Sequence, residues 1–402
     1  MTGDLVTVFL CGDVMLGRGV DQVLPHPGDP ALAEAYVSDA RTYVRLAEAA
    51  YGPVPRPAPY SWPWGVALDV LDAAAPDVRV LNLETSVTRG GERAVGKGIH
   101  YRMHPGNLPA LTAVRPDVCA LANNHVLDFG RPGLTDTLDA LDALGAPGSS
   151  TGAGVRRAGA GRDAAEAWAP AVVPLPGGRR LLVLACGTAS SGVPRDWAAT
   201  ARRSGVARVD EPLDPARPAA VLRAAKRPGD LAVVSVHWGG NWGYGVSGEQ
   251  RRFAHALVDA GADVVHGHSS HHPRPLEAYR GALVLYGCGD LVNDYEGISG
   301  HEEYRDDLRL LYLVSLAADG AFRQVRMVPL RARRLRLEHA PNEGSAWLQR
   351  TLAQVSGRFG VQVARERDGT LTARPQRAGA RPERGRPEGG SPARGEGGRN
   401  GA

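Results

Sequence analysis

Val264-Val-His-Gly-His-Ser-Ser-His-His-Pro273 is the stretch on which the prediction of the fold depends. The apolar residues 262–265 are typical of the end of a buried strand, and four histidines follow within the next seven residues. Neutral imidazoles that gather just past a strand end can converge on one metal ion. The whole chain has 12 histidines, so four of them in one short stretch indicate a metal site rather than unrelated surface or core positions.

Length and composition describe an ordinary globular protein. At 402 residues, with 43% hydrophobic and 22% charged residues, the chain can bury a large core in one or two α/β domains. No apolar run approaches the roughly eighteen residues of a membrane span. The N-terminal stretch from Met1 to Asp4 has neither the basic region nor the cleavage site of a signal peptide. We therefore expect a soluble, cytoplasmic protein without a membrane anchor.

Charge and cysteine content exclude two further classes of protein. The formal net charge is +4, and the seven Arg and three Glu from Ala373 onward account for all of it. The remaining chain is close to neutral, which argues against nucleic acid as a partner. The four cysteines, at 11, 119, 186 and 288, are far apart and form no CxxC pair. We expect them to be small buried core residues rather than disulfides or zinc ligands.

Four further apolar runs end in side chains that can bind a metal. Residues 6–11 lead to Asp13, residues 78–84 end in Glu84, residues 116–122 lead to Asn124 and His125, and residues 231–236 lead to His237. Strands of one sheet place their ends on one edge, so these residues can meet the histidines although they lie far apart in the sequence. Carboxylate, amide and imidazole groups together suit Mn²⁺, Zn²⁺ or Fe rather than Ca²⁺ or Cu(I). The residues therefore predict one or two divalent metal ions as the cofactor.

The rest of the chain predicts the elements that frame these strand ends. We expect helices around 31–50, 64–74, 134–144, 219–227, 249–260 and 344–357, further strands at 180–186 and 282–288, and an antiparallel pair from 308–317 and 322–330. Residues 1–340 are expected to form the main domain and 341–372 a C-terminal helix with a short extension. Residues 373–402, rich in Arg, Pro and Gly, are expected to be a disordered tail.

Five motifs carry a resemblance to a known family. They are Asp13-x-Met15-x-x-Arg18, Asn82-x-Glu84, Asn123-Asn124-His125, His237-Trp-Gly and Gly267-His-x-x-His271. In this order they resemble the CapA proteins, which are poly-γ-glutamate capsule biosynthesis proteins related in fold to the calcineurin-like metallophosphoesterases. The likeness covers roughly residues 5–330. It implies an α/β fold, a four-layer α/β/β/α sandwich of two mixed sheets, with the metal site at the sheet edges.

The resemblance also implies a role for each matching residue. Asp13 and His271 would hold the first metal, and Glu84 would bridge to the second. The second metal would be held by Asn124, His237 and His268. His125 would act as general acid or as a partner of the developing oxyanion. Arg18 would hold an anionic oxygen of the substrate, because its planar fork matches phosphate or carboxylate.

The sequence departs from the phosphoesterase pattern at two places. Met15 stands where those enzymes have a histidine ligand, and a thioether is a soft donor that suits Mn²⁺ or Zn²⁺ poorly. Whether one or two metals bind is therefore open. The extra residues in the histidine stretch leave the ligand open between His266 and His268. Asp290, Asn293 and Asp294 follow another strand end and are either partners that orient the histidines or caps of a turn.

Two functions from different classes fit these residues. The first is a metal-dependent hydrolase of the phosphoesterase type, acting on a phosphate ester or a γ-glutamyl-type anionic substrate. The second is a non-catalytic accessory or scaffold protein that binds a polyanionic polymer and works with partners of a capsule-type biosynthesis. Metal content and turnover favour the first function, whereas polymer binding without metal favours the second.

Overall fold

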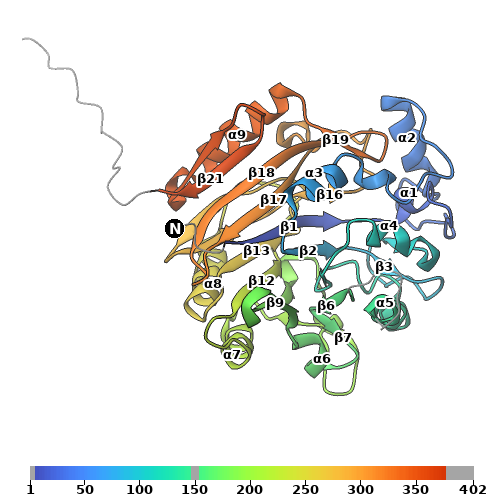
Figure 1. Cartoon of the computed structure of the whole chain (residues 1–402). Helices are drawn as coiled ribbons and strands as arrows, with labels where there is room; N and C mark the ends of the chain where they lie inside the picture. Colours follow the sequence, from blue (N-terminus) through green and yellow to red (C-terminus); the bar gives the residue numbers. More distant parts are fainter. Residues whose placement is uncertain (1–4, 146–153, 377–402) are drawn as a thin grey trace, which may run out of the picture.

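The computed structural model describes residues 5–145 and 154–376, and Figure 1 shows two β-sheets with helices on their outer sides. The expected tail begins inside the described part, since residues 373–375 belong to the last strand, whereas 377–402 lie outside the described residues. The expected α/β class with two mixed sheets is confirmed.

The first sheet has ten strands and is parallel only in part. Its main path runs through β20 (Val361–Arg365), β21 (Leu371–Pro375), β18 (Phe322–Ala332), β17 (Leu308–Leu316), β1 (Val6–Val14), β2 (Val78–Leu83), β5 (Val118–Ala120) and β6 (Arg156–Ala158). The strands from β1 to β6 in this path are parallel, and those from β17 to β20 are antiparallel. Two more strands pair outside the path: β16 (Asp290–Val292) with β1, and β19 (Leu337–His339) with β18.

The second sheet has seven strands with a parallel centre. Its path runs through β11 (Arg208–Val209), β9 (Arg180–Thr188), β12 (Leu231–His237), β13 (Val264–His268), β15 (Ala282–Leu285) and β14 (Leu276–Tyr279). β14 pairs antiparallel with β15, and β8 (Ala171–Pro174) pairs antiparallel with β9. Two short pairs complete the strands: β3 (Ser86–Val87) with β4 (Arg102–Met103), and β7 (Ala160–Gly161) with β10 (Gly205–Val206).

Alternate residues of the second sheet face two different apolar cores. Val183 of β9 and Val233 of β12 belong to a core that also contains Leu10 of the first sheet. Their neighbours, such as Leu184 and Val234, pack instead with three helices, α6 (Ala164–Trp168), α7 (Ala216–Ala225) and α8 (Gly248–Asp259). Successive side chains of a strand point to opposite faces, so a strand covered on both faces is a continuous apolar run. This is why residues 231–236 could be recognised as a buried strand.

Helices also cover the outer face of the first sheet. They are α3 (Ala67–Ala74), α4 (Leu108–Thr112), α5 (Gly130–Gly145) and α9 (Asn342–Ser356), and each adds leucines to the larger core. In Figure 1, α3 and α9 lie on one side of the molecule and α6 and α7 on the opposite side, with the sheets between them.

Some predicted helix boundaries were wrong. The predicted helix at 64–74 is a 3₁₀ turn, Trp62–Trp64, followed by α3, because Gly65 between them has a positive φ of 46°. The region predicted as partly helical, 31–50, forms a helix only as α2 (Arg41–Tyr51). A single short turn, α1 (Arg18–Asp21), follows β1.

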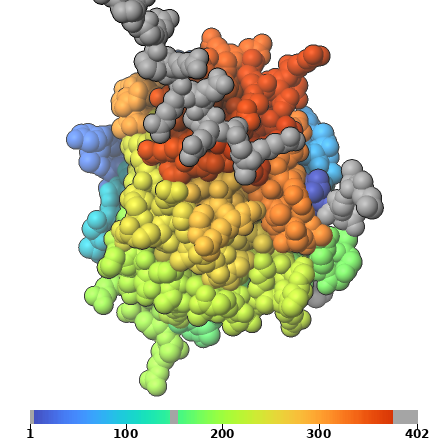
Figure 2. Space-filling view, turned by 90° about the vertical axis from the view of Figure 1, so that its left-hand side faces the viewer, coloured from blue at the N-terminus to red at the C-terminus, as the bar shows by residue number. Residues whose placement is uncertain are grey.

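The C-terminal segment joins both sheets. β21 pairs with β18, and the backbone N–H of Leu276 in β14 donates a hydrogen bond of 3.0 Å to the hydroxyl of Ser356. In Figure 2 this segment, coloured red, lies directly against the yellow and orange part of the chain. The antiparallel pair predicted at 308–317 and 322–330 is present as β17 and β18. None of the helices in residues 5–145 and 154–376 is long and apolar enough to cross a membrane.

Candidate metal centre

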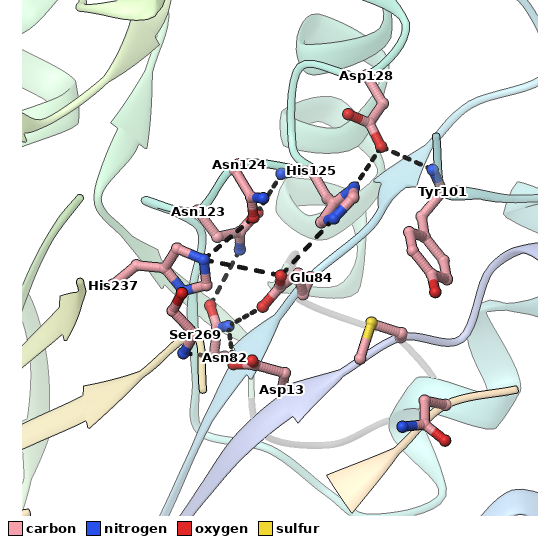
Figure 3. Close-up of polar contacts among 12 residues, drawn as sticks. Asp13, Asn82, Glu84, Tyr101, Asn123, Asn124, His125, Asp128, His237 and Ser269 are labelled. Atoms are coloured by element: carbon pink, nitrogen blue, oxygen red, sulfur yellow. Dashed lines mark hydrogen bonds and ion pairs between the residues drawn. The ribbon is translucent and has the colours of Figure 1, made fainter. Parts of the chain in front are cut away.

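The polar strand ends predicted from the sequence meet in one buried place, but they come from two sheets rather than one. β1 carries Asp13, while Glu84 and Asn124 follow β2 and β5 of the same sheet. His237 and His268 end β12 and β13 of the second sheet, where they are direct neighbours in the parallel register. Figure 3 shows that the side chains from the two sheets point toward one another.

Two hydrogen-bonded asparagines, Asn82 and Asn123, fix the two carboxylates that the first sheet contributes, Asp13 and Glu84. The Asn82 side-chain amide donates to Asp13 Oδ1 at 2.8 Å and to Glu84 Oε2 at 2.7 Å. Asn123 in turn donates to the Asn82 carbonyl oxygen at 2.9 Å, which fixes the orientation of that amide. The pKa of Asp13 is raised to about 7, first by burial and then by the charge of Asp290. The pKa of Glu84 is raised well above its usual value by burial and by Asp13.

His237 and His268 form the first group of metal-binding side chains with Asp13. The ligand atoms of the three residues all lie within 4.8 Å of one another. Ser235 Oγ lies 2.8 Å from Nε2 of His268, so that Nδ1 of this ring faces Asp13 Oδ1 at 3.9 Å. Burial lowers the pKa of both histidines well below the usual value, which leaves them neutral. Neutral imidazole is the form that binds a metal.

Asn124 and Glu84 border this first group. Nε2 of His237 lies 3.0 Å from the Asn124 side-chain oxygen and 3.7 Å from Glu84 Oε1. Both residues were predicted from the sequence as ligands. The structure places their oxygens on the same side of the His237 ring, as the dashed lines in Figure 3 show.

A second group consists of Asp13, His271 and Asp290, again with ligand atoms within 4.8 Å of one another. Asp290 in β16 is the register partner of Asp13 in β1, and its Oδ1 lies 3.0 Å from Nδ1 of His271. Burial favours the neutral form of His271, but the charge of Asp290, the hydrogen bond to it and the charge of Asp13 together outweigh burial, so the pKa of His271 is raised. Among the described residues, Asp13 is the side chain common to both groups, a position that the sequence prediction gave to Glu84.

The donor set fits one or two divalent cations. Three buried carboxylates, Asp13, Glu84 and Asp290, lie close together: Asp290 adds to burial in raising the pKa of Asp13, and both aspartates add to burial in raising the pKa of Glu84. Burying unpaired like charges costs free energy that a bound cation offsets. Carboxylate oxygens with neutral imidazoles and an amide suit Mn²⁺, Zn²⁺ or Fe²⁺.

The structure separates the roles of His266 and His268. Nε2 of His266 lies 2.8 Å from the Cys11 carbonyl oxygen, and its Nδ1 lies 3.1 Å from Ser235 Oγ. Both ring nitrogens of His266 are therefore occupied, and the contact with Cys11 joins the two sheets. Of the two candidates left open by the sequence, His268 is the one that lies beside Asp13.

His125 lies on the far side of Glu84, within a charged cluster. Its Nδ1 is 2.7 Å from Asp128 Oδ2 and 2.9 Å from Lys97 Nζ, and its Nε2 is 3.9 Å from Glu84 Oε1. Lys97 also donates to Asp128 Oδ1 and to the backbone oxygen of Asn124. The Tyr101 backbone N–H donates to Asp128 Oδ2 at 2.6 Å. Burial lowers the pKa of His125 to about 4.

Arg18 differs from the prediction. Its guanidinium donates to Asp294 through Nε and Nη2, and to Glu34 Oε1 through Nη1 at 2.9 Å. It also lies 3.7 Å from the centre of the Tyr43 ring. Only 2% of the Arg18 side chain is exposed, and its guanidinium binds carboxylates of the protein itself. The sequence-based prediction was that this guanidinium binds an anionic oxygen of the substrate.

Met15 and the cysteines are core residues. The Met15 side chain is buried, and its sulfur accepts a hydrogen bond from the Tyr295 hydroxyl at 3.7 Å. All four cysteines are free and buried, which confirms the prediction.

Sequence reasoning underestimated three residues at this site. Asp290 was left between a partner of the histidines and a turn cap, and neither Lys97 nor Asp128 was among the predicted site residues. The signal for Asp128 was its position three residues after His125. The chain holds two lysines, Lys97 and Lys226, among 47 Lys and Arg residues, so a lysine here was itself a signal.

Residues 7–295 match the sequence model of a family described as bacterial capsule synthesis protein PGA_cap. The chain belongs to this family. A probable polyglutamine synthesis accessory protein of Mycobacterium tuberculosis is 53% identical over 376 residues, which cover 92% of this chain and 97% of that protein. The PGA biosynthesis protein CapA of Bacillus subtilis is 27% identical over 320 residues, 79% of this chain and 70% of that protein. The resemblance predicted from the five motifs is thus confirmed.

One solved structure similar to this chain is that of a 5'-nucleotidase precursor from Thermus thermophilus. The two chains share 17% sequence identity with a TM-score of 0.45, and the match covers 82% of this chain and 54% of that chain.

Proposed function

We propose that this chain is a metal-dependent hydrolase that acts on an anionic substrate, either a phosphate ester or a γ-glutamyl-type amide, in poly-γ-glutamate biosynthesis. The observation that carries the proposal is the position of Asp13 in two groups of metal-binding side chains, next to the His125–Asp128 pair. The names of the two relatives, a polyglutamine synthesis accessory protein and a PGA biosynthesis protein, support the biosynthetic context.

The residues of the chain divide into holding and proton-transfer roles. Asp13, His237 and His268 would hold one cation and Asp13 with His271 the other, with Glu84 and Asn124 at the border. A divalent metal bound there polarises a substrate oxygen and lowers the pKa of a bound water. His125, neutral at pH 7, carries or accepts a proton at Nε2, the atom that faces Glu84. Asp128 and Lys97 hold its Nδ1 and so orient the ring.

An open cavity of about 910 Å³ provides a route for the substrate. Its wall is formed by the loop at 91–97, the start of α5 at 129–132 and residues from 192–197. Lys97 lines this cavity and also contacts His125, and Gly192 lies against the Asn124 side chain, so the cavity reaches the border of the metal centre. The wall carries the cations Arg93, Lys97 and Arg131 beside the anions Glu92 and Asp196, so the three cations can contact an anionic chain.

Metal analysis followed by a substrate screen tests the proposal. The protein is purified without added metal, and its Mn, Zn and Fe content is measured beside the variants His237→Ala and Glu84→Ala. We expect about one or two equivalents in the wild type, reduced in both variants, and hydrolysis of phosphate esters or γ-glutamyl amides that falls in parallel. A folded wild-type protein that takes up no metal and hydrolyses none of these substrates would contradict the proposal.

A non-catalytic accessory role is the second candidate, because the Mycobacterium tuberculosis relative carries the word accessory in its name and the cavity wall presents Arg93, Lys97 and Arg131 to an anionic polymer. This role predicts that poly-γ-glutamate binds equally well to wild type and to His237→Ala, with no turnover by either. Binding that weakens with Arg93→Ala and Arg131→Ala would locate the polymer in the cavity. The cytoplasmic location expected from the sequence belongs to both candidates and is tested by cell fractionation.

A further inference from the structure

The second group of side chains is incomplete without Asp290. Asp13 and His271 alone would give a cation two protein ligands, and metal sites that retain an open position for water usually have three. Met15 is a poor third ligand, since its soft sulfur suits Mn²⁺ or Zn²⁺ badly and accepts a hydrogen bond from Tyr295. Among the described residues, Asp290 is the third member of this group.

We propose that Asp290 is a direct carboxylate ligand of a divalent cation held between Asp13, His271 and Asp290. This inference rests on the metal-dependent function proposed above and adds one residue that the family motifs do not contain. It makes Asp13 the bridge between two cations, one on each side of its carboxylate.

The pairing of β16 with β1 brings the two aspartates together. Asp13 and Asp290 are register partners, and the Asp13 N–H donates to the Gly289 carbonyl oxygen at 3.2 Å. A Cβ at Gly12 would lie 1.8 Å from that same oxygen, so the strands approach more closely than any side chain at 12 would permit. Asp290 is 2% exposed and Asp13 is fully buried. Two carboxylates buried side by side repel each other, and a cation between them offsets that cost in addition to the hydrogen bonds that each already accepts.

The second oxygen of Asp290 is held from behind. Oδ2 accepts from the Asn293 amide at 2.6 Å, and the Asn293 oxygen accepts from Arg309 Nη2 at 3.0 Å. Arg309 lies in β17 and is almost completely buried. The carboxylate is therefore fixed by neighbours on one oxygen, while Oδ1 faces His271 and the Asp13 side of the site. Oriented ligands of this kind are typical of metal centres.

The alternative is that Asp290 only orients the His271 ring through its contact with Nδ1. Asp290→Asn separates the two roles, because an amide oxygen still accepts a hydrogen bond from Nδ1 but is a much weaker ligand than a carboxylate. The full chain is loaded with Mn²⁺ and desalted. Metal per chain is then measured by mass spectrometry, and electron paramagnetic resonance shows whether the Mn²⁺ ions are spin-coupled.

We expect about two equivalents with a coupled spectrum in the wild type and about one, uncoupled, in Asp290→Asn and in Asp290→Ser. The matched control Met15→Leu should keep both equivalents. Two coupled equivalents in both Asp290 variants, or loss of one in Met15→Leu, would overturn the assignment while leaving the hydrolase proposal intact. A wild-type protein that binds no Mn²⁺ would overturn both. Thermal unfolding in chelator checks that each variant is folded.

Discussion

At the scale of single residues, Lys97 controls the state of His125. Its ammonium lies 2.9 Å from Nδ1, and its charge adds to burial in lowering the pKa of His125. We predict that Lys97→Met raises this pKa, because a neighbouring cation is removed while Asp128 remains. The ring also loses a contact that orients it, so hydrolysis should fall by about tenfold or more.

An NMR titration of the His125 ring measures this shift directly. The matched control is Lys226→Met, which removes the other lysine of the chain, paired with Asp263 on the second sheet. An unchanged or lower pKa of His125 in Lys97→Met would show that the contact seen here does not govern its protonation.

Asp13 makes a prediction about stability. Its pKa is raised from 3.8 to about 7 in the folded chain, so the folded state binds a proton more tightly than the unfolded state. Without metal, the contribution of Asp13 to the free energy of unfolding is most favourable below about pH 4. It decreases as the pH rises from about 4 to about 7, where the folded chain loses this proton. Asp13→Asn should therefore raise the melting temperature of the metal-free protein at pH 8 by a few degrees and abolish the stabilisation by added Mn²⁺.

Thermal unfolding of wild type and Asp13→Asn in chelator, at pH 5 and at pH 8, checks this sign. The gain in melting temperature should be larger at pH 8. A variant that is less stable than the wild type at pH 8 in chelator would mean that the carboxylate is satisfied by protein groups alone.

At the scale of elements, the approach of β16 to β1 determines the shape of the site. Gly12→Ala would place a methyl group 1.8 Å from the Gly289 carbonyl oxygen, and backbone rather than a flexible side chain would have to move. We expect a loss of stability of about 2 kcal/mol or more and weaker Mn²⁺ binding, because Asp290 moves away from Asp13. Denaturant unfolding and metal titration measure both effects.

The matched control for this change is Gly357→Ala, at a position where an added Cβ meets nothing within 4 Å. It should change stability by less than about 0.5 kcal/mol. Equal behaviour of the two variants would show that close strand contact at Gly12 has no influence on the metal centre.

The sequence predicted the ends of the buried strands but not how those strands pair. Apolar runs followed by Asp, Glu, Asn or His predicted the strand ends near Asp13, Glu84, Asn124 and His237. This works because a strand buried on both faces is a continuous apolar run, and polar residues are tolerated only where that run ends. The position of Asp290 beside Asp13 depends on a pairing between strands at opposite ends of the family region. No local pattern contains that register, so its part in the site could not be predicted.

At the scale of the whole molecule, the site lies between two sheets that share one apolar core. Strand composition predicted buried strands but not which sheet each would join. The apolar runs alone therefore suggested one sheet edge, whereas the family resemblance implied two mixed sheets, which the structure has. Arg18 illustrates the same limit. An arginine guanidinium binds anions, and the sequence suggested that the anion is the substrate. In the folded chain the anions are the carboxylates of Asp294 and Glu34. Contacts between residues far apart in the sequence decide which sheet a strand joins and which anion Arg18 binds, and a single sequence does not show those contacts.

Anomalous diffraction from crystals grown with Mn²⁺ would locate each cation relative to Asp13. We expect two peaks about 3.5–4 Å apart, one in contact with Asp13, His237 and His268 and the other with Asp13, His271 and Asp290. Crystals of protein that binds Mn²⁺ in solution but shows a peak at neither position, or only at a place away from Asp13, would contradict this expectation.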